Sequence, residues 1–287
     1  MPRHPLTLQL VTYPGTAGHD LSWWVVPGTR GGAPVAERRL GVWRRFSVML
    51  LKPWMLILTR RDWRGAEHIP ASGGVILVAN HVSHFDPLVL AHFVYETGRW
   101  PRFLAKASLF DIPVIGGLMR AVQQIPVRRG TADAAKALDA AIQAVRSGKS
   151  VIIYPEGTTT RDPDLWPMRG KTGVARLALE TGAPVVPVVT WGSHRVFDPR
   201  TKKLRPRPLS PVVVAASGPL DLSGWTGQPA GVALSAQALT ELTDMVMGQL
   251  RESLAEIRGV RSPPVQRRSS ASGDASGGAL SEGEARL

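Results

Sequence analysis

Residues 75–87 read VILVANHVSHFDP, and this stretch indicates the fold class. Its first five residues are apolar, which predicts a buried strand over 75–79. Pro87 suits the first turn of a helix, so a helix is predicted to begin at about that residue. A buried strand that leads through polar residues into a helix is typical of an α/β domain, in which ligands bind beyond the carboxyl ends of the strands.

His81 and Asp86 are the candidate catalytic pair in this stretch. On a continuous helix, positions five apart are rotated by about 140° and would not meet, but a chain that leaves a strand and turns into a helix can bring them together. A carboxylate that binds one imidazole nitrogen fixes the tautomer, so the other nitrogen can accept a proton from a hydroxyl group. The alternative is that both side chains only cap the helix and bind backbone groups.

Short apolar runs alternate with longer amphipathic stretches beyond Gly73. This alternation predicts an α/β domain with a central mixed, largely parallel β-sheet flanked by helices. Further strands are predicted at 103–105, 124–127, 151–154, 185–190 and 211–216. Helices are predicted at 131–147, 172–180 and 235–257.

An amphipathic stretch precedes the sheet, between residues 36 and 65. Pro53 disfavours helix at Lys52 and suits the start of a second helix, so the stretch is predicted to be an N-terminal amphipathic helical hairpin. Indole rings and arginines suit a membrane interface, which makes an anionic membrane surface the expected partner; the alternative is a helix packed on the core. Apolar residues recur there at helical spacing among arginines: Trp43, Phe46, Leu50, Trp54 and Ile57.

The 287-residue chain carries 35 Lys and Arg against 22 Asp and Glu, a formal net charge of +13. This excess predicts an anionic partner, and nucleic acid, anionic lipid and a phosphorylated substrate all qualify. Cysteine is absent, which excludes disulfides, thiolate-bound zinc and a cysteine acyl-enzyme. The sequence shows no secretory signal and no apolar run of membrane-spanning length, so a cytoplasmic protein is expected.

If acyl chemistry occurs, the sequence offers no protein nucleophile to start it. It has no G-x-S-x-G elbow, and Ser193 in WGSH does not match that motif. Direct attack by an acceptor hydroxyl on an acyl carbonyl is therefore preferred over a covalent acyl-enzyme. No metal is expected, because His81 and His84 lack the further His or carboxylate spacing of a metal site.

Two more polar clusters follow predicted strands. IPVRR (125–129) places guanidinium groups suited to phosphate at a strand end, and Lys106 could supply a point charge of the same sign. In YPEGTT (154–159), Glu156 could accept hydrogen bonds from a polyol, and Gly157 lets a ligand approach the backbone. Taken singly, each cation could equally be a solvated surface residue, and the PEGT sequence an ordinary turn.

Four motifs in this order, NHVSHFDP (80–87), IPVRR, YPEGTT and APVVPV (183–188), resemble the glycerolipid acyltransferase family that includes the 1-acylglycerol-3-phosphate acyltransferases. The resemblance implies transfer of an acyl group from acyl-CoA or acyl-carrier protein to the sn-2 hydroxyl of 1-acylglycerol-3-phosphate, which forms phosphatidic acid without a cofactor. It also implies that His81 and Asp86 are the catalytic pair. The residues that the resemblance assigns to the phosphorylated acceptor are Lys106, Arg129, Glu156, Gly157 and Thr158.

This chain departs from the family pattern at two positions. Thr159 stands where the family usually has arginine after Glu-Gly-Thr, and Gln123 stands where the second motif commonly begins with glycine. Both positions belong to the acceptor site, so another lysophospholipid, an aminolipid or a glycolipid is an alternative acceptor. A non-enzymatic protein that binds membrane or nucleic acid is an alternative of another class, although no nucleic-acid-binding module is recognised and no nucleic acid is expected as a partner.

The predicted organisation has four parts: an irregular extension (1–35), membrane-associating amphipathic helices (36–65), the acyltransferase domain (66–257) and a disordered basic tail (258–287). The tail is assigned because Ser, Gly, Pro and Arg dominate its composition. A lysophospholipid acceptor resides in a bilayer, so the expected location is the cytoplasmic face of the cell membrane, as a peripheral or monotopic protein.

Overall fold

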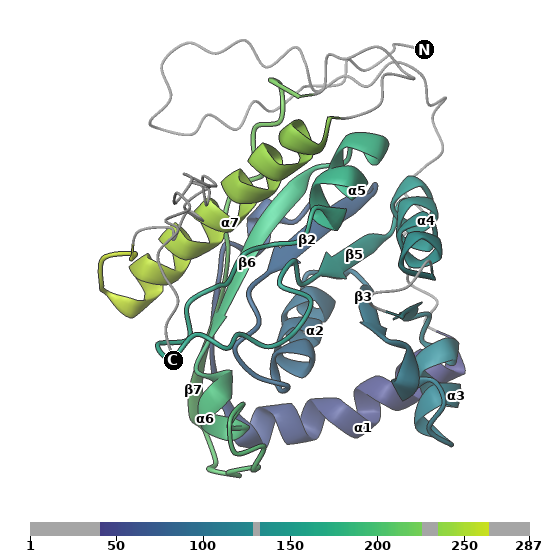
Figure 1. Cartoon of the computed structure of the whole chain (residues 1–287). Helices are drawn as coiled ribbons and strands as arrows, with labels where there is room; N and C mark the ends of the chain where they lie inside the picture. The colour runs from purple at the N-terminus through teal and green to yellow at the C-terminus, as the bar shows by residue number, and fades with distance from the viewer. Residues whose placement is uncertain (1–40, 129–132, 226–234, 264–287) are drawn as a thin grey trace, which may run out of the picture. The chain divides into compact units, whose positions relative to one another are not determined.

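The computed structural model describes residues 41–128, 133–225 and 235–263. The predictions for the N-terminal extension and for the tail beyond residue 263 lie outside these residues. In the described part of the chain, seven strands form a sheet in the order β1-β7-β6-β2-β5-β3-β4 (Figure 1). The strands are β1 (Thr59–Arg64), β2 (Val75–Ala79), β3 (Pro101–Lys106), β4 (Ile125–Val127), β5 (Ser150–Ile153), β6 (Val185–Trp191) and β7 (Ser210–Ala216). The helices are α1 (Val42–Leu58), α2 (Asp86–Glu96), α3 (Ile115–Ala121), α4 (Asp133–Arg146), α5 (Gly173–Thr181), α6 (Ser193–Val196) and α7 (Ala236–Arg258), with short 3-10 helices η2 (Ala66–His68) and η3 (Ala107–Leu109).

Neighbouring strands of the sheet run parallel, except that β6 and β7 are antiparallel. The predicted mixed, largely parallel sheet flanked by helices is therefore confirmed. Each strand and helix predicted beyond Gly73 is present, with its observed ends within two residues of the predicted ones. The short helices α3 and α6 were not predicted, because neither is long enough to show a helical repeat.

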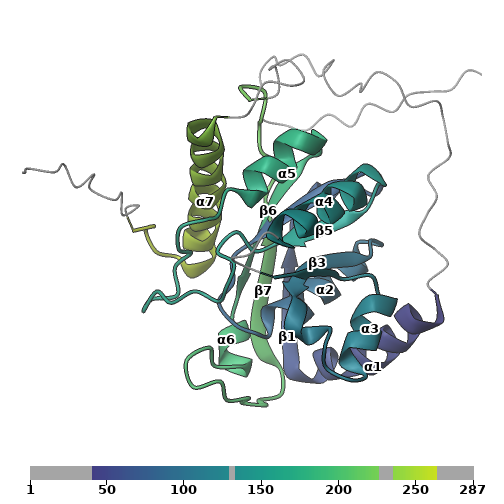
Figure 2. The same ribbon diagram turned by 45° about the vertical axis from the view of Figure 1, so that its right-hand side comes forward.

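The central strand β2 is buried on both sides because helices cover both faces of the sheet (Figure 2). Ile76 and Val78 belong to one core cluster, together with apolar residues of α4, α5 and α7. Leu77 points to the opposite face and belongs to a second cluster, together with Phe93 of α2. A strand that is buried on both faces has a continuous apolar sequence, which is what residues 75–79 show.

One helix and one strand take the place of the predicted N-terminal hairpin. α1 continues through Pro53, so the prediction of two short helices is wrong. Pro53 has no backbone N–H, so the helix loses the hydrogen bond to the carbonyl oxygen of Met49. The buried side chain of Met55 packs in the same core cluster as α2 and holds the part of α1 that follows Pro53. Residues 59–64 are also not helical, because they pair with β7 as a parallel strand at the edge of the sheet.

The carboxylate of Glu96, the last residue of α2, ties α1 and β1 to that helix. Glu96 Oε1 accepts a hydrogen bond from Arg61 Nη1 (2.9 Å) and lies 3.6 Å from Lys52 Nζ. Glu96 Oε2 accepts a hydrogen bond from Trp63 Nε1 (2.8 Å). One carboxylate thus joins the N-terminal helix and the edge strand to a helix of the core.

Over the residues that the structure describes, no helix is both long and apolar enough to cross a bilayer.

Gly65 turns the chain after β1, with a φ angle of +67°. A Cβ atom at this position would lie 1.9 Å from the carbonyl oxygen of Ala216, the last residue of β7. Gly65→Ala should therefore lower the free energy of unfolding by about 3 kcal/mol, through left-handed strain of about 1–2 kcal/mol and a clash of similar size. Urea unfolding followed by circular dichroism measures this difference.

Gly73→Ala is the matched control for this substitution. Gly73 also has a positive φ, of +78°, but no atom lies within 4 Å of the added Cβ. It should therefore lose only the contribution from strain. Equal losses in the two variants would contradict the close approach of Gly65 to β7.

Candidate active site

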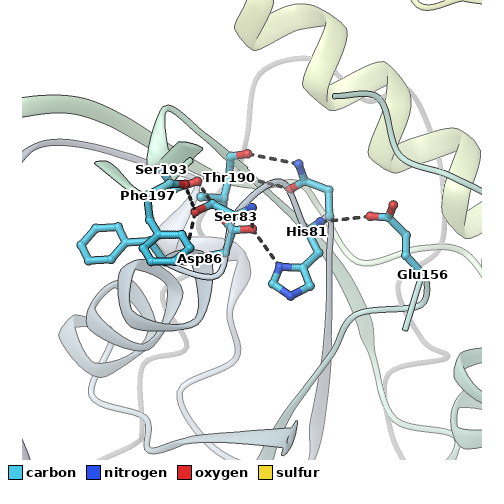
Figure 3. A network of polar contacts seen from close by, with 9 residues as sticks. His81, Ser83, Asp86, Glu156, Thr190, Ser193 and Phe197 are labelled. Carbon is cyan, nitrogen blue, oxygen red and sulfur yellow. Dashed lines mark hydrogen bonds and ion pairs between the residues drawn. The ribbon is translucent and has the colours of Figure 1, made fainter. Parts of the chain in front are cut away.

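His81 and Asp86 meet at the carboxyl end of β2. His81 follows the strand after one residue, and Asp86 is the first residue of α2. His81 Nδ1 lies 2.9 Å from Asp86 Oδ2, as the dashed line in Figure 3 marks. The prediction that the chain folds back to join this pair is confirmed. The backbone N–H of Ser83 also donates to Asp86 Oδ2 (2.8 Å), so Asp86 makes the predicted backbone bond as well.

The imidazole ring of His81 is held so that one nitrogen remains for a substrate. Its Nδ1 is engaged by Asp86, and this carboxylate assigns the hydrogen to Nδ1 and the lone pair to Nε2. The ring stacks on Tyr154, with centroids 4.2 Å apart and planes inclined by 20°. Burial raises the pKa of the Tyr154 hydroxyl well above its usual range, so the stacking partner is neutral.

Glu156 holds the backbone of His81 in place through a hydrogen bond. The N–H of His81 donates to Glu156 Oε1 (3.0 Å), and the N–H of Met168 donates to Glu156 Oε2 (3.0 Å). The N–H of Thr160 donates in turn to the carbonyl oxygen of His81 (2.7 Å). Sequence reasoning gave Glu156 a hydrogen bond to a polyol, but both carboxylate oxygens accept from backbone instead, because the loop around 156–168 folds over the side chain.

The other predicted acceptor residues are distributed differently. Lys106 and Thr158 line the same cavity as His81. Gly157 has a φ of +72°, and a Cβ there would lie 3.1 Å from Lys171 Nζ. The side chain of Lys171 therefore approaches the backbone of Gly157 closely, where the sequence predicted the approach of a ligand. Arg129 lies outside the described residues.

A cavity of about 620 Å³ extends from His81 between α1, α2, β3 and α3. Its volume lies in the range of small-molecule binding sites. Sequence reasoning did not place α1 or α3 at the site, because no local pattern shows which face of a helix meets a cavity. Apolar side chains that line the cavity include Leu51, Met55, Leu88, Ala91, Phe103, Leu118, Met119 and Val122. Among the described residues, no group of three or more His, Asp or Glu side chains is placed to hold a metal ion.

Ser193 is a site residue that sequence reasoning missed. Its hydroxyl donates a hydrogen bond to Asp86 Oδ1, the oxygen that faces away from His81, and both side chains are fully buried. Gly192 makes this possible, because a Cβ there would lie 2.2 Å from the carbonyl oxygen of Pro211. The sequence offered one signal, because Gly192 and Ser193 directly follow a predicted strand. The structure shows that this strand, β6, is the neighbour of β2 in the sheet.

Asn80 fixes the ends of these two strands relative to each other. Its side-chain amide donates to the carbonyl oxygen of Thr190 (3.1 Å), and its side-chain oxygen accepts from the N–H of Thr190 (2.7 Å). Figure 3 shows Thr190 beside the contacts of Asp86. The strand that leads to His81 and the strand that leads to Ser193 are therefore held in register next to the site.

The buried carboxyl group of Glu156 makes stability depend on pH. Burial raises its pKa from 4.5 to about 7, although the two backbone N–H groups act in the opposite direction. A carboxyl whose pKa is raised by folding stabilises the fold fully below pH 4.5, and this contribution is lost as the pH rises through about 7. The stability of the wild type relative to Glu156→Gln, which is neutral throughout, should fall by about 3 kcal/mol between pH 4.5 and 8.

Urea unfolding of both proteins across this pH range measures the difference. The fall should be complete by about pH 8, since the carboxyl is ionised there in both the folded and the unfolded chain. A difference in stability that stays constant from pH 4.5 to 8 would contradict a raised pKa for Glu156.

Known proteins are similar in sequence and in fold to the part of the chain that contains the site. Residues 60–191 match the family model described as Acyltransferase. The chain is 31% identical over 160 residues to the chloroplastic 1-acyl-sn-glycerol-3-phosphate acyltransferase BAT2 of Brassica napus, an alignment that covers 54% of this chain and 45% of the relative. It is 36% identical over 134 residues to the 1-acyl-sn-glycerol-3-phosphate acyltransferase of Borreliella burgdorferi, which covers 46% of this chain and 52% of the relative. The chain spans about half the length of these curated relatives.

A solved structure extends the similarity beyond the family model. The crystal structure of the 1-acyl-sn-glycerophosphate (LPA) acyltransferase PlsC from Thermotoga maritima superposes with a TM-score of 0.55 and 25% identity, over 77% of this chain and 82% of that chain. The resemblance that the four motifs indicated is therefore confirmed. Residues 60–191 of this chain are thus similar in sequence to the acyltransferase family.

Proposed function

We propose that this protein transfers a fatty acyl group from acyl-CoA or acyl-carrier protein to the sn-2 hydroxyl of 1-acylglycerol-3-phosphate, which yields phosphatidic acid. The observation that carries the proposal is the 2.9 Å contact between His81 Nδ1 and Asp86 Oδ2 beside an apolar cavity. The names of the relatives, two of which are 1-acyl-sn-glycerol-3-phosphate acyltransferases, support this choice of acceptor.

In the proposed reaction, His81 acts as general base and then as general acid. Nε2 accepts the proton of the sn-2 hydroxyl while the hydroxyl oxygen forms a bond to the acyl carbonyl carbon. The C–S bond of the tetrahedral intermediate then breaks, and the departing sulfur takes the proton from Nε2 and leaves as a thiol. Asp86 keeps the proton on Nδ1 and stabilises the imidazolium that exists between the two steps. These steps need neither a metal nor an organic cofactor.

The cavity suits substrates that carry an acyl chain. Its walls are mostly apolar side chains of α1, α2 and α3, which favour a hydrocarbon chain over water. Lys106 lies at the carboxyl end of β3 and lines the same cavity, so we assign it to bind the acceptor's phosphate; Lys52, which also lines the cavity, is paired with Glu96. We assign Thr158 to the same group, and Arg129 on the basis of the resemblance.

We also propose that the protein works at the cytoplasmic face of the cell membrane, as a peripheral or monotopic protein, with an anionic membrane surface and no nucleic acid as partner. Both lipids of the proposed reaction reside in bilayers. α1 carries the exposed aromatic side chains Trp43, Phe46 and Trp54 beside Arg44 and Arg45, a combination suited to lipid headgroups.

Removing the base should abolish transfer. His81→Ala should lower kcat/KM by about 10³-fold or more, and Asp86→Asn should lower it by a similar factor because the amide no longer fixes the tautomer. The measurement is transfer of labelled palmitate from palmitoyl-CoA to a panel that contains 1-acylglycerol-3-phosphate, another lysophospholipid and a lyso-glycolipid. Full activity of His81→Ala would contradict the mechanism, and a preference for another lipid would change the proposed acceptor.

Ser193 should act on turnover through Asp86. Ser193→Ala removes a hydrogen bond to a buried charged group, which corresponds to about 1.5–3 kcal/mol and hence a fall in kcat of roughly 10- to 100-fold. KM should change little, because Ser193 is not among the residues that line the cavity.

Ser150→Ala is the matched control for Ser193→Ala. Ser150 is also buried, and its hydroxyl donates to the carbonyl oxygen of Trp100 (2.7 Å) at the other end of the parallel strands. It should lower the free energy of unfolding by about 1 kcal/mol, the usual loss for a hydrogen bond between neutral groups, and leave kcat unchanged. Equal falls of kcat in both variants would show that Ser193 only contributes stability.

A further inference from the structure

The loop between η3 and α3 exposes a group of apolar side chains. Val114 is 87% exposed, Ile115 is 47% exposed and Ile112 is 42% exposed, and Leu109 precedes them. A soluble surface seldom gathers large apolar side chains in so short a segment, so such a group indicates a binding surface. We propose that residues 109–115 are a second membrane-inserting element, which enters the bilayer together with α1.

The backbone of this loop is folded so that Val114 points outward. Pro113, Val114 and Ile115 form a γ-turn, in which the N–H of Ile115 donates to the carbonyl oxygen of Pro113 (2.7 Å). Val114 has φ +67° and ψ −55°, a conformation that is strained for a β-branched residue. Strain of this kind persists where the surroundings enforce it and is concentrated at functional segments.

The surroundings of the loop enforce its conformation. A Cβ at Gly116 would lie 2.0 Å from the carbonyl oxygen of Phe110, so the two ends of the loop touch. The same oxygen accepts a hydrogen bond from Arg120 Nη1 (2.9 Å), and the N–H of Gly116 donates to the carbonyl oxygen of Ile112 (2.8 Å). The apolar side chains are therefore presented by a fixed turn.

The loop lies on the same side of the protein as α1. α3 packs beside the N-terminal half of α1 in both views, and Arg44 of α1 donates to Gln123 Oε1 just after α3 (2.6 Å) (Figures 1 and 2). At the other end of α1, the N–H of Leu209 donates to the carbonyl oxygen of Ile57 (2.9 Å). Leu209 is 60% exposed and, like Val114, has a positive φ, of +53°.

Exposed apolar side chains are concentrated on this side. Over the described residues, the large ones lie on α1, on 109–115 or at Leu204 and Leu209, apart from Leu88 in the cavity wall and Val260 beyond α7. Basic residues outnumber acidic ones around these segments: α1 contains no acidic residue, and Asp111 is the one acidic residue within 109–115. This excess of positive charge favours an anionic lipid surface over a second copy of this basic chain. Basic residues near these segments include Arg44, Arg45, Lys106, Arg120, Lys202, Lys203, Arg205 and Arg207.

Insertion of this loop would place the mouth of the cavity against the bilayer. Leu109 of the loop and Leu51 of α1 both line the cavity that contains His81. A lipid could then reach the cavity from the bilayer between two inserted segments. The inference does not require acyl transfer, because binding to vesicles is measured without turnover.

The absence of cysteine allows the insertion of one position to be measured directly. Val114→Cys in the full chain takes a single NBD label, and the chain is mixed with vesicles of phosphatidylcholine and phosphatidylglycerol. The label should gain intensity and shift to the blue on binding, because its surroundings become apolar. Val260→Cys is the matched control: Val260 is 49% exposed but lies beyond the end of α7, and its label should not change.

A second pair of variants separates binding from folding. Val114→Gly removes the side chain and accepts the positive φ, so it should raise the melting temperature and weaken vesicle binding about 3- to 10-fold in sedimentation. Val260→Gly should leave binding unchanged.

Two results would overturn the proposal. One is an NBD label at position 114 that stays water-exposed on vesicles to which the protein is bound. The other is a dimer in solution that Val114→Gly disperses while vesicle binding stays at the wild-type level, which would assign the loop to a protein interface.

Discussion

The fully buried carboxylate of Asp86 accepts hydrogen bonds from three segments of the chain. His81 reaches it from the end of β2, Ser83 from the turn before α2, and Ser193 from the residue pair that follows β6. A buried carboxylate is tolerated only when its oxygens accept hydrogen bonds, so loss of any one donor weakens the stabilisation of this buried charge. The geometry of the proposed base and the arrangement of the central strands are therefore set by the same group, and one cannot change without the other.

A second carboxylate supports the first from the opposite side of His81. Glu156 accepts from the backbone of His81 and of Met168, which joins the loop after β5 to the residue that carries the base. The residues of the YPEGTT motif thus divide between two tasks. Glu156 shapes the backbone of the site, while Thr158 lines the cavity where a substrate would bind. A motif that is chemically suited to a polyol can owe its acidic residue to the fold.

The sequence was informative where the signal is local. The apolar runs predicted the strands, and the turn from strand to helix, together with the family resemblance, predicted the pairing of His81 with Asp86. The course of α1 through Pro53 was not predicted, because it depends on the packing of Met55 against a core that the local sequence does not show. Ser193 and the backbone contacts of Glu156 were missed for a related reason: their partners lie 107 and 75 residues away along the chain. Sequence reasoning found the residue types of the site, and only the sheet topology brought their partners together.

α2 connects two of the features described above, because Asp86 is its first residue and Glu96 its last. At a rise of 1.5 Å per residue, the ten steps along α2 separate Asp86, the partner of the proposed base, from the carboxylate that holds α1 and β1 by about 15 Å. The separation of Asp86 from Glu96 is therefore set by the length of one helix. An inserted or deleted residue would also rotate Glu96 by about 100° away from Arg61 and Trp63. The length of α2 is therefore constrained at both ends: by the contact of Asp86 with His81 at its start, and by the hydrogen bonds of Glu96 at its end.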